Sequence, residues 1–314
     1  MSFARYNVFF AFFAFLAGCN AGGQVAPAPY AQSGSEPAWM APDAKNADLL
    51  YVSDSGANAV DVFSYPGGKL EGSLTVTDPH GLCADSRGDV YVVDSHDATI
   101  EEFVHGGTKP IKTLLDTGYY PLGCALDPSS GKLAVLGDSQ GSSQGSVAIY
   151  KHAEGQPQDY SDPNIFGYSY ASYDSKGDLY FDGQLRDGYF VFAEMPHGTT
   201  SFTSITLNVS ILIPTGVQCD GPYVDVADQI PGYRGSTIYQ FKISGNSGTS
   251  EGSTPLEGSA TIGQFWIERD RVIGPNSGPS EKDVLFWKYP VGGDAVKTLT
   301  GFVEPDAALV SRAR

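Results

Sequence analysis

Five side chains with useful chemistry occupy one kind of position, the turn that leads into the first strand of a repeated unit. They are His80, Tyr120, Phe166, Thr215 and Asp306. His96, in a loop between a second and a third strand, is expected to share their face. A mixed aromatic and polar set suits a small polar or peptide-like ligand. His80 could also act as a base or a metal ligand, and a turn histidine without a task is the alternative.

The unit that positions these residues is clearest between Pro79 and Gly107. Val90–Val93 is β-branched and aromatic, as a buried strand requires, and polar turns separate it from its neighbours. Pro110–Leu115 adds a fourth strand, and the intervening residues leave no room for a helix. Four short strands in about forty residues are typical of a propeller blade.

Degraded copies of this unit recur along most of the chain. They can be aligned on the glycine that opens each first strand, at Gly81, Gly123, Gly167, Gly216 and Gly263. The spacings are 42, 44, 49 and 47 residues, as expected for blade-type repeats.

The two ends of the repeat region each hold part of a blade. Leu49–Val76 lacks a first strand, whereas Asp306–Ser311 looks like a first strand with nothing after it. Joining the fragments would close the ring and leave no open sheet edge. We therefore predict an all-β fold, a six-bladed β-propeller over residues 48–314, in which the C-terminal strand completes the first blade.

Aspartate recurs at the end of the second strands, at Asp54, Asp94, Asp138 and Asp228, with Asp182 one position early. A residue that nearly every blade needs is rarely catalytic. We expect these carboxylates to cap turns by accepting hydrogen bonds from the backbone.

Residues 1–18 are typical of a lipoprotein signal peptide. Val8–Leu16 is an apolar run too short to span a bilayer, and the sequence Leu-Ala-Gly-Cys that ends at Cys19 resembles a lipobox. This resemblance to bacterial lipoproteins implies a lipid on Cys19 and a chain anchored outside the cytoplasm. Because Asn20 rather than Asp follows, it favours the outer membrane where a cell has two; an ordinary secretory signal is the alternative. Residues 19–47, rich in Ala, Gly, Pro and Ser, are predicted to form a disordered tether.

Charge and cysteine usage narrow the possible partners. The formal charge of −17 argues against nucleic acid and anionic lipid surfaces, which would repel the chain. Three cysteines remain after Cys19, namely Cys83, Cys124 and Cys219, and an odd number cannot pair completely. Because they lie at different offsets in their strands, we expect three buried thiols that behave as small apolar side chains.

Two family resemblances follow from the repeat. The pattern Gly-x-x-x-Asp-x-x-Gly-x-x-Tyr-Val-x-Asp that starts at Gly81, with an apolar strand ending in Phe103, resembles the NHL repeats. The chain also resembles gluconolactonase-like and regucalcin-like six-bladed propellers. That likeness implies one divalent cation in the channel, calcium or zinc, held by Glu, Asn and Asp from separate blades. Here Pro-His-Gly at residues 79–81 replaces the Pro-Asn-Gly often found in that family, and Leu49–Ser53 holds no acid, so two of the three ligands have no counterpart.

We therefore predict a binding or scaffolding module of the bacterial cell envelope that recruits a protein, peptide or glycan at the mouth of the channel. No cofactor is identified, and enzymatic activity is not favoured. The alternative is a metal-dependent, lactonase-like hydrolase or lyase that uses His80 with acids such as Asp306. A purely structural envelope component is a third reading. An enzyme should gather unpaired carboxylates or histidines inside the channel, whereas a binding module should present aromatic residues around its rim.

Overall fold

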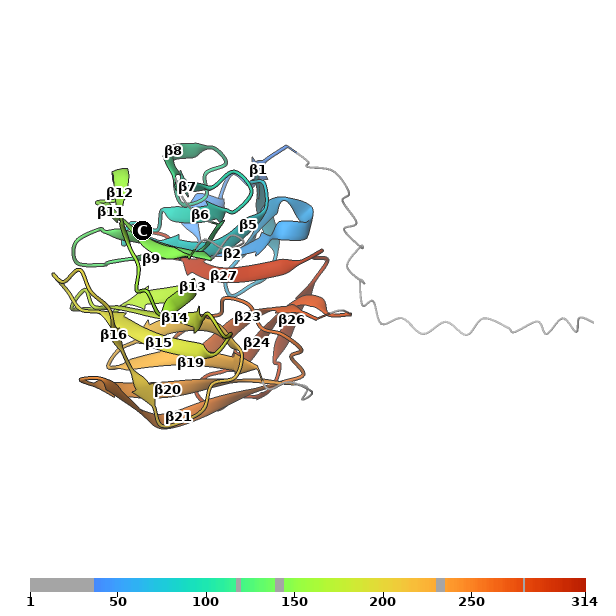
Figure 1. Ribbon diagram of the computed structural model, residues 1–314. Coiled ribbons are helices and arrows are strands. Elements are labelled where there is room, and N and C mark those ends of the chain that lie inside the picture. The colour runs from blue at the N-terminus through green and yellow to red at the C-terminus, as the bar shows by residue number, and fades with distance from the viewer. Residues whose placement is uncertain (1–36, 117–119, 139–143, 230–234, 279) are drawn as a thin grey trace, which may run out of the picture. The chain divides into compact units, whose positions relative to one another are not determined.

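The structure, a computed structural model, describes residues 37–116, 120–138, 144–229, 235–278 and 280–314. In these ranges the only helices are two single turns of 3₁₀ helix, η1 (Ala44–Asn46) and η2 (Ser55–Ala57). None of the helices in the described ranges is long and apolar enough to cross a membrane. The strands form six sheets, which are the blades of a six-bladed β-propeller (Figure 1). This confirms the predicted fold class.

Within each blade, neighbouring strands follow one another from the outer edge towards the central channel. Blade 1 contains β1 (Trp39–Met40), β4 (Leu70–Thr75), β3 (Ala59–Ser64), β2 (Leu49–Asp54) and β27 (Pro305–Ser311). Blade 2 contains β8 (Pro110–Leu115), β7 (Thr99–Phe103), β6 (Val90–Asp94) and β5 (Pro79–Ala84). Blade 3 contains β12 (Glu154–Tyr160), β11 (Ser146–Lys151), β10 (Leu133–Asp138) and β9 (Tyr120–Leu126).

The other three blades follow the same order. Blade 4 contains β16 (Thr203–Ser204), β15 (Phe190–Met195), β14 (Leu179–Leu185) and β13 (Ile165–Tyr173). Blade 5 contains β17 (Thr206–Leu207), β21 (Ser247–Glu257), β20 (Ser236–Ser244), β19 (Tyr223–Gln229) and β18 (Pro214–Asp220), with β25 (Gly293–Asp294) also paired to β21. Blade 6 contains β26 (Lys297–Thr300), β24 (Lys282–Lys288), β23 (Arg271–Ser277) and β22 (Trp266–Glu268).

The two chain ends build blade 1 together, as predicted. β27 pairs antiparallel with β2, with Leu49 opposite Ser311 and Tyr51 opposite Leu309. In Figure 1 β27, in red, therefore belongs to the same sheet as the blue strands from the start of the repeat region. β27 also contacts β5 of blade 2 and β23 of blade 6, so this strand closes the ring between the first and the last blade.

The glycine that opens the repeats is required where neighbouring inner strands approach each other. A Cβ atom on Gly81 would lie 2.5 Å from the carbonyl oxygen of Leu122 on the next inner strand. At Gly123 and Gly263 it would lie closer still to the carbonyl oxygens of Ser169 and Asp306. Real Cβ atoms do not approach backbone so closely, so these positions need glycine for space rather than for a turn.

The apolar core lies between blades. One cluster joins Leu49 and Tyr51 of blade 1 to Leu82 and Val92 of blade 2, and all four are fully buried. Similar clusters join the later blades. Because both faces of a blade are covered, its central strands are almost continuously apolar, which is what made Val90–Val93 recognisable in the sequence.

The recurring aspartates cap the loops, as predicted. Asp54 accepts hydrogen bonds from the backbone nitrogens of Val303 (2.8 Å) and Glu304 (2.7 Å), in the loop that enters β27. Asp228 holds the loop that enters β18 in the same way, through two bonds of 2.9 Å. In blade 6 the role falls to Asn276, which accepts a bond of 2.7 Å from the nitrogen of Ala260. These side chains fix the loops that lead into the channel.

The prediction of three buried thiols is wrong for two of them. Cys83 on β5 and Cys124 on β9 form a disulfide, with 5.7 Å between their Cα atoms. The bond is possible because the consecutive inner strands β5 and β9 lie side by side, which brings these two positions within disulfide range. Cys219 is free, and burial raises the pKa of its thiol to about 12.

The first sheet starts earlier in the chain than residue 48. Trp39–Met40 pairs antiparallel with β4 and extends blade 1 outwards. Ala44 in η1 is buried in the cluster that joins blades 1 and 2. The C-terminal part of the expected tether is therefore packed on the propeller, whereas residues 1–36, with the predicted signal peptide and Cys19, lie outside the described ranges.

Candidate functional site

The candidate site is the end of the channel at which the inner strands begin, which we call the mouth. In an antiparallel meander, the turn into the first strand and the loop between the second and third strands lie at this same end. Five of the predicted residues, His80, Tyr120, Phe166, Thr215 and Asp306, lie on the first two positions of an inner strand. The topology therefore brings all five to one end of the channel.

His80 lies between two carboxylates at the mouth. Its Nε2 atom is 3.4 Å from Oδ1 of Asp78, and its Nδ1 atom is 3.8 Å from Oδ2 of Asp306. All three side chains remain partly exposed, with 23% for His80, 31% for Asp78 and 28% for Asp306. Each ring nitrogen thus faces an acid, which favours a bound or paired imidazole over a free base.

Tyr120 ties the next inner strand to this group. Its hydroxyl donates a hydrogen bond of 2.9 Å to Oδ2 of Asp78, and its ring meets that of His80 edge-on, with 6.0 Å between the centroids. Burial, followed by the bond to Asp78, raises the pKa of Tyr120 to about 12. The phenol therefore remains a donor at neutral pH. We call Asp78, His80, Tyr120 and Asp306 the mouth cluster.

Several polar atoms around the mouth have no hydrogen-bond partner among the described residues. They are Oδ2 of Asp306, Oδ2 of Asp182 and Oγ1 of Thr215. Asp182 is fully buried and Thr215 is 6% exposed. Asp182 uses its other oxygen to accept a bond of 2.7 Å from the nitrogen of Tyr170. Buried polar atoms that lack a partner cost free energy, so they point to water or a ligand as the missing partner.

Burial shifts the pKa values of the acidic groups near the mouth. Burial raises the pKa of Asp182 to about 7 and also raises that of Asp306, although Ser55 and His80 act against the rise at Asp306. The pKa of Tyr170 is raised by burial and then by the charges of Asp182 and Asp306.

Phe166 and His96 occupy the same end but do not join the mouth cluster. The guanidinium carbon of Arg186 lies 4.5 Å from the centroid of the Phe166 ring, as in a cation–π pair. His96 is exposed and pairs with Asp97 through a 2.8 Å contact, which raises its pKa. Both residues belong to the rim. The mouth thus combines carboxylates and a histidine inside with an aromatic rim, and the simple contrast expected between enzyme and binding module does not hold.

Among the residues that the structure describes, no three His, Cys, Asp or Glu side chains converge as metal ligands would. The mouth cluster supplies two carboxylates and one imidazole, but the imidazole lies between the acids. In the described ranges a cation therefore has no site built from three such side chains.

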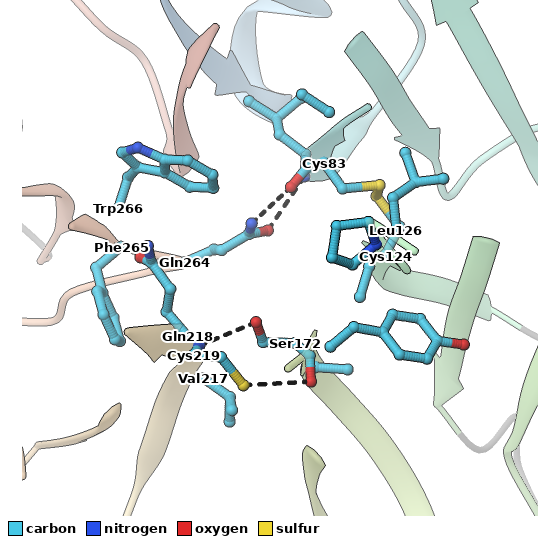
Figure 2. A pocket seen from close by; sticks show the side chains of 16 residues that line it. Cys83, Cys124, Leu126, Ser172, Val217, Gln218, Cys219, Gln264, Phe265 and Trp266 are labelled. Carbon is cyan, nitrogen blue, oxygen red and sulfur yellow. Dashed lines mark hydrogen bonds between the residues drawn. A yellow bond between two sulfur atoms is a disulfide. The ribbon is translucent and has the colours of Figure 1, made fainter. Parts of the chain in front are cut away.

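A second hollow lies at the opposite end of the channel, where the inner strands end. This base pocket has a volume of about 210 Å³ and is lined by inner strands of five blades (Figure 2). Gln264 spans blades by accepting a bond from the nitrogen of Leu82 (3.1 Å) and donating one to its carbonyl oxygen (2.6 Å). Gln218 makes the same paired contact with Ile267. The Cys83–Cys124 disulfide also lines this pocket (Figure 2).

The polar groups of the base pocket are occupied with each other. Ser172 accepts a bond of 3.0 Å from the nitrogen of Cys219, and its carbonyl oxygen accepts from the thiol at 3.7 Å. Like the two glutamines, it ties one inner strand to the next. At the base pocket, these polar side chains therefore bond to neighbouring inner strands and hold the blades together.

Sequence reasoning missed one residue of the mouth. Asp78 holds both His80 and Tyr120, and its φ of 49° is in the left-handed region that Asp adopts more readily than most residues. Its position directly before the Pro-His-Gly turn was the available signal.

Fold and site together define a six-bladed β-propeller with a polar channel mouth. Residues 77–103 match the family model of the NHL repeat. A chain of the nidogen/laminin complex superposes with a TM-score of 0.69 at 14% identity, covering 85% of this chain and 100% of that one. A protein of unknown function from Bacteroides caccae gives a TM-score of 0.63 at 11% identity, covering 85% and 99%. At such identities the likeness concerns the fold alone, and no curated protein sequence matches.

Proposed function

We propose that this chain is an exported, lipid-anchored β-propeller that binds a protein or peptide segment at the mouth. An NHL-type propeller is in general a binding or scaffolding module. The observation that carries the finer proposal is the partly exposed mouth cluster of acids, imidazole and phenol, surrounded by an aromatic rim. Such a mixture of convergent polar groups and aromatic rings is typical of ligand sites.

The position of His80 favours binding over catalysis. A general base needs a ring nitrogen that faces its substrate. Here both nitrogens face carboxylates, at 3.4 and 3.8 Å. The described part of the chain also holds no group of three His, Cys, Asp or Glu side chains that would bind a metal.

The disulfide supports the proposed location outside the cytoplasm. Disulfides persist in oxidising compartments and are rare in the cytosol, and Cys83–Cys124 is buried in the propeller core. The lipid anchor rests on the sequence around Cys19. If it exists, Cys19→Ala should move the protein from the membrane fraction to the soluble fraction without changing its melting midpoint. A variant that stays with the membrane would contradict the anchor.

The binding proposal can be tested on arrays of peptides and glycans probed with the full chain. We expect retained peptides whose signal is lost in His80→Ala or Phe166→Ala. The matched control is His152→Ala, an exposed histidine at the opposite end of the propeller. Hits that survive both mouth substitutions would contradict the proposal. A set of hits made only of glycans would move it to a glycan module, and a midpoint raised by calcium or zinc and restored by EDTA would favour the metal enzyme.

A further inference from the structure

The base pocket is a hollow that the inner strands leave open where their side chains are small. Ala84 of blade 2 and Ala171 and Ser172 of blade 4 line it and remain partly exposed. Larger side chains at these positions would fill the space. The volume of about 210 Å³ exceeds the roughly 150 Å³ of an engineered cavity that binds benzene. The base pocket can therefore hold one small ring system.

The lining of the base pocket carries no charge. None of the residues that line it, all of which the structure describes, is Asp, Glu, Lys, Arg or His. Burial raises the pKa of the Cys219 thiol to about 12 and also raises the pKa of the Tyr173 phenol, so both groups are neutral at neutral pH. A charged molecule would lose its hydration here without gaining a partner of opposite charge, which is costly. The lining therefore selects an uncharged ligand.

The polar side chains of the base pocket keep part of their hydrogen-bonding capacity. A carboxamide has two N–H groups and two lone pairs. Gln264 uses one of each on the backbone of Leu82, and Gln218 uses one of each on the backbone of Ile267. In bonds to described residues, each glutamine thus keeps one donor and one acceptor. Ser172 accepts from the nitrogen of Cys219, and its hydroxyl hydrogen remains for a ligand.

The backbone contacts also fix the orientation of the two carboxamides. Each amide bonds to both the nitrogen and the carbonyl oxygen of one residue, so turning it over would lose both bonds. The remaining donors and acceptors are therefore in place before a ligand arrives. Such preorganisation lowers the entropy cost of binding.

An aromatic ring lies beside these polar groups. Trp266 of β22 lines the base pocket and is partly exposed, and its Nε1 atom donates a hydrogen bond of 3.4 Å to Oε2 of Glu268. Figure 2 shows Trp266, Gln264 and Gln218 around the same hollow. Aromatic side chains stack on the faces of planar rings, those of nucleobases included. The combination of ring and carboxamides suits a planar ligand with polar edges.

From these observations we infer that the base pocket binds a small uncharged planar ring that carries both hydrogen-bond donors and acceptors, as a free pyrimidine or purine base does. The carboxamides of Gln264 and Gln218 bond to the edge of this ring, and Trp266 packs against its face. A nucleotide is disfavoured because its phosphate finds no basic side chain in the lining. The base pocket lies at the opposite end of the channel from the mouth, so this inference does not rest on the proposed function.

The test titrates uracil, adenine, orotate and benzene separately into the full chain by calorimetry. Uracil and adenine are uncharged at neutral pH, orotate is uracil with an added carboxylate, and benzene is a planar ring without polar groups. We expect at least one of the two bases to bind, and orotate and benzene to bind about tenfold more weakly or less. Ala84→Leu, which fills the hollow, should abolish the binding. Trp266→Leu, which removes the ring and keeps an apolar side chain, should weaken it about tenfold.

The matched control is Tyr189→Ala, which removes a ring that is 70% exposed in the turn between β14 and β15, at the mouth end. It should bind the bases like the parent chain. Each variant is measured below its melting midpoint, so that lost binding is not lost folding. Failure of both bases to bind at millimolar concentration would overturn the inference. So would equal binding of orotate or benzene, or unchanged affinity in both Ala84→Leu and Trp266→Leu.

Discussion

Loss of the Cys83–Cys124 disulfide should destabilise the propeller by an amount that depends on the number of residues between the two cysteines. The bond joins residues 41 positions apart, on the inner strands of blades 2 and 3. In the chain-entropy description, closing a loop of this length lowers the entropy of the unfolded state by an amount worth about 4 kcal/mol at 25 °C. For a domain of this size, each kcal/mol moves the melting midpoint by about 2 °C, so we expect a loss of about 8 °C.

The perturbation is the double substitution Cys83→Ala and Cys124→Ala, because both side chains are buried and serine would place hydroxyls there. The assay measures the melting midpoint with and without reductant, under conditions in which the reductant reaches the disulfide. Reductant should lower the midpoint of the parent chain towards that of the double variant and leave the variant unchanged. Thiol counting in denaturant should show two additional thiols after reduction.

Two results would refute this reasoning. If reduction releases no additional thiols, the bond is absent in the protein. If it releases two but the midpoint stays where it was, the two inner strands are held fully by other contacts, such as the close approach of Gly81 to Leu122. Cys219→Ala is the control, because that thiol is free and its loss should leave the response to reductant unchanged.

Three further predictions follow from the packing. Gly123→Ala should cost roughly 1–3 kcal/mol of stability in a denaturant titration, because its Cβ would meet the carbonyl oxygen of Ser169; an unchanged midpoint would contradict the spacing role. Asp54→Ala should cost about 1–2 kcal/mol by leaving the loop nitrogens before β27 unpaired, and Asp54→Asn should recover part of it. Burial raises the pKa of Asp225 to about 8, so the folded chain binds more protons than the unfolded chain between pH 3.8 and 8, and this group makes stability fall as pH rises through that window. Asp225→Asn should therefore raise the midpoint at pH 8 and flatten the fall, and an unchanged pH profile would show that Asp225 does not retain its proton.

The blade order could be predicted because every blade has to meet the same packing requirements. The strand Val90–Val93 is apolar throughout because both of its faces are covered. The glycine that opens each repeat, such as Gly81, recurs because neighbouring inner strands touch there. The complementary end fragments were readable for the same reason, because Leu49–Val76 and Asp306–Ser311 each lacked what the other supplied.

What could not be predicted depends on contacts between blades. Cys83 and Cys124 lie at different offsets from their glycines, and only the lateral approach of β5 and β9 brings them within bonding distance. The paired bonds of Gln264 and Gln218 are equally invisible, because a glutamine facing a neighbouring strand has no local signature. At the mouth, the predicted residues came from the repeat alignment, whereas Asp78 emerged only from its contacts with His80 and Tyr120.

The five histidines of the chain offer the most direct test of the mouth as the binding site. His80 and His96 lie at the mouth end, and His105, His152 and His197 follow third strands, at the opposite end. Histidine-selective NMR of the full chain, recorded while a retained array peptide is added, reports on both ends at once. The account predicts shifts of the His80 resonances, with the three histidines of the opposite end unchanged. Shifts confined to those three, with His80 unmoved at saturation, would place the ligand elsewhere and contradict it.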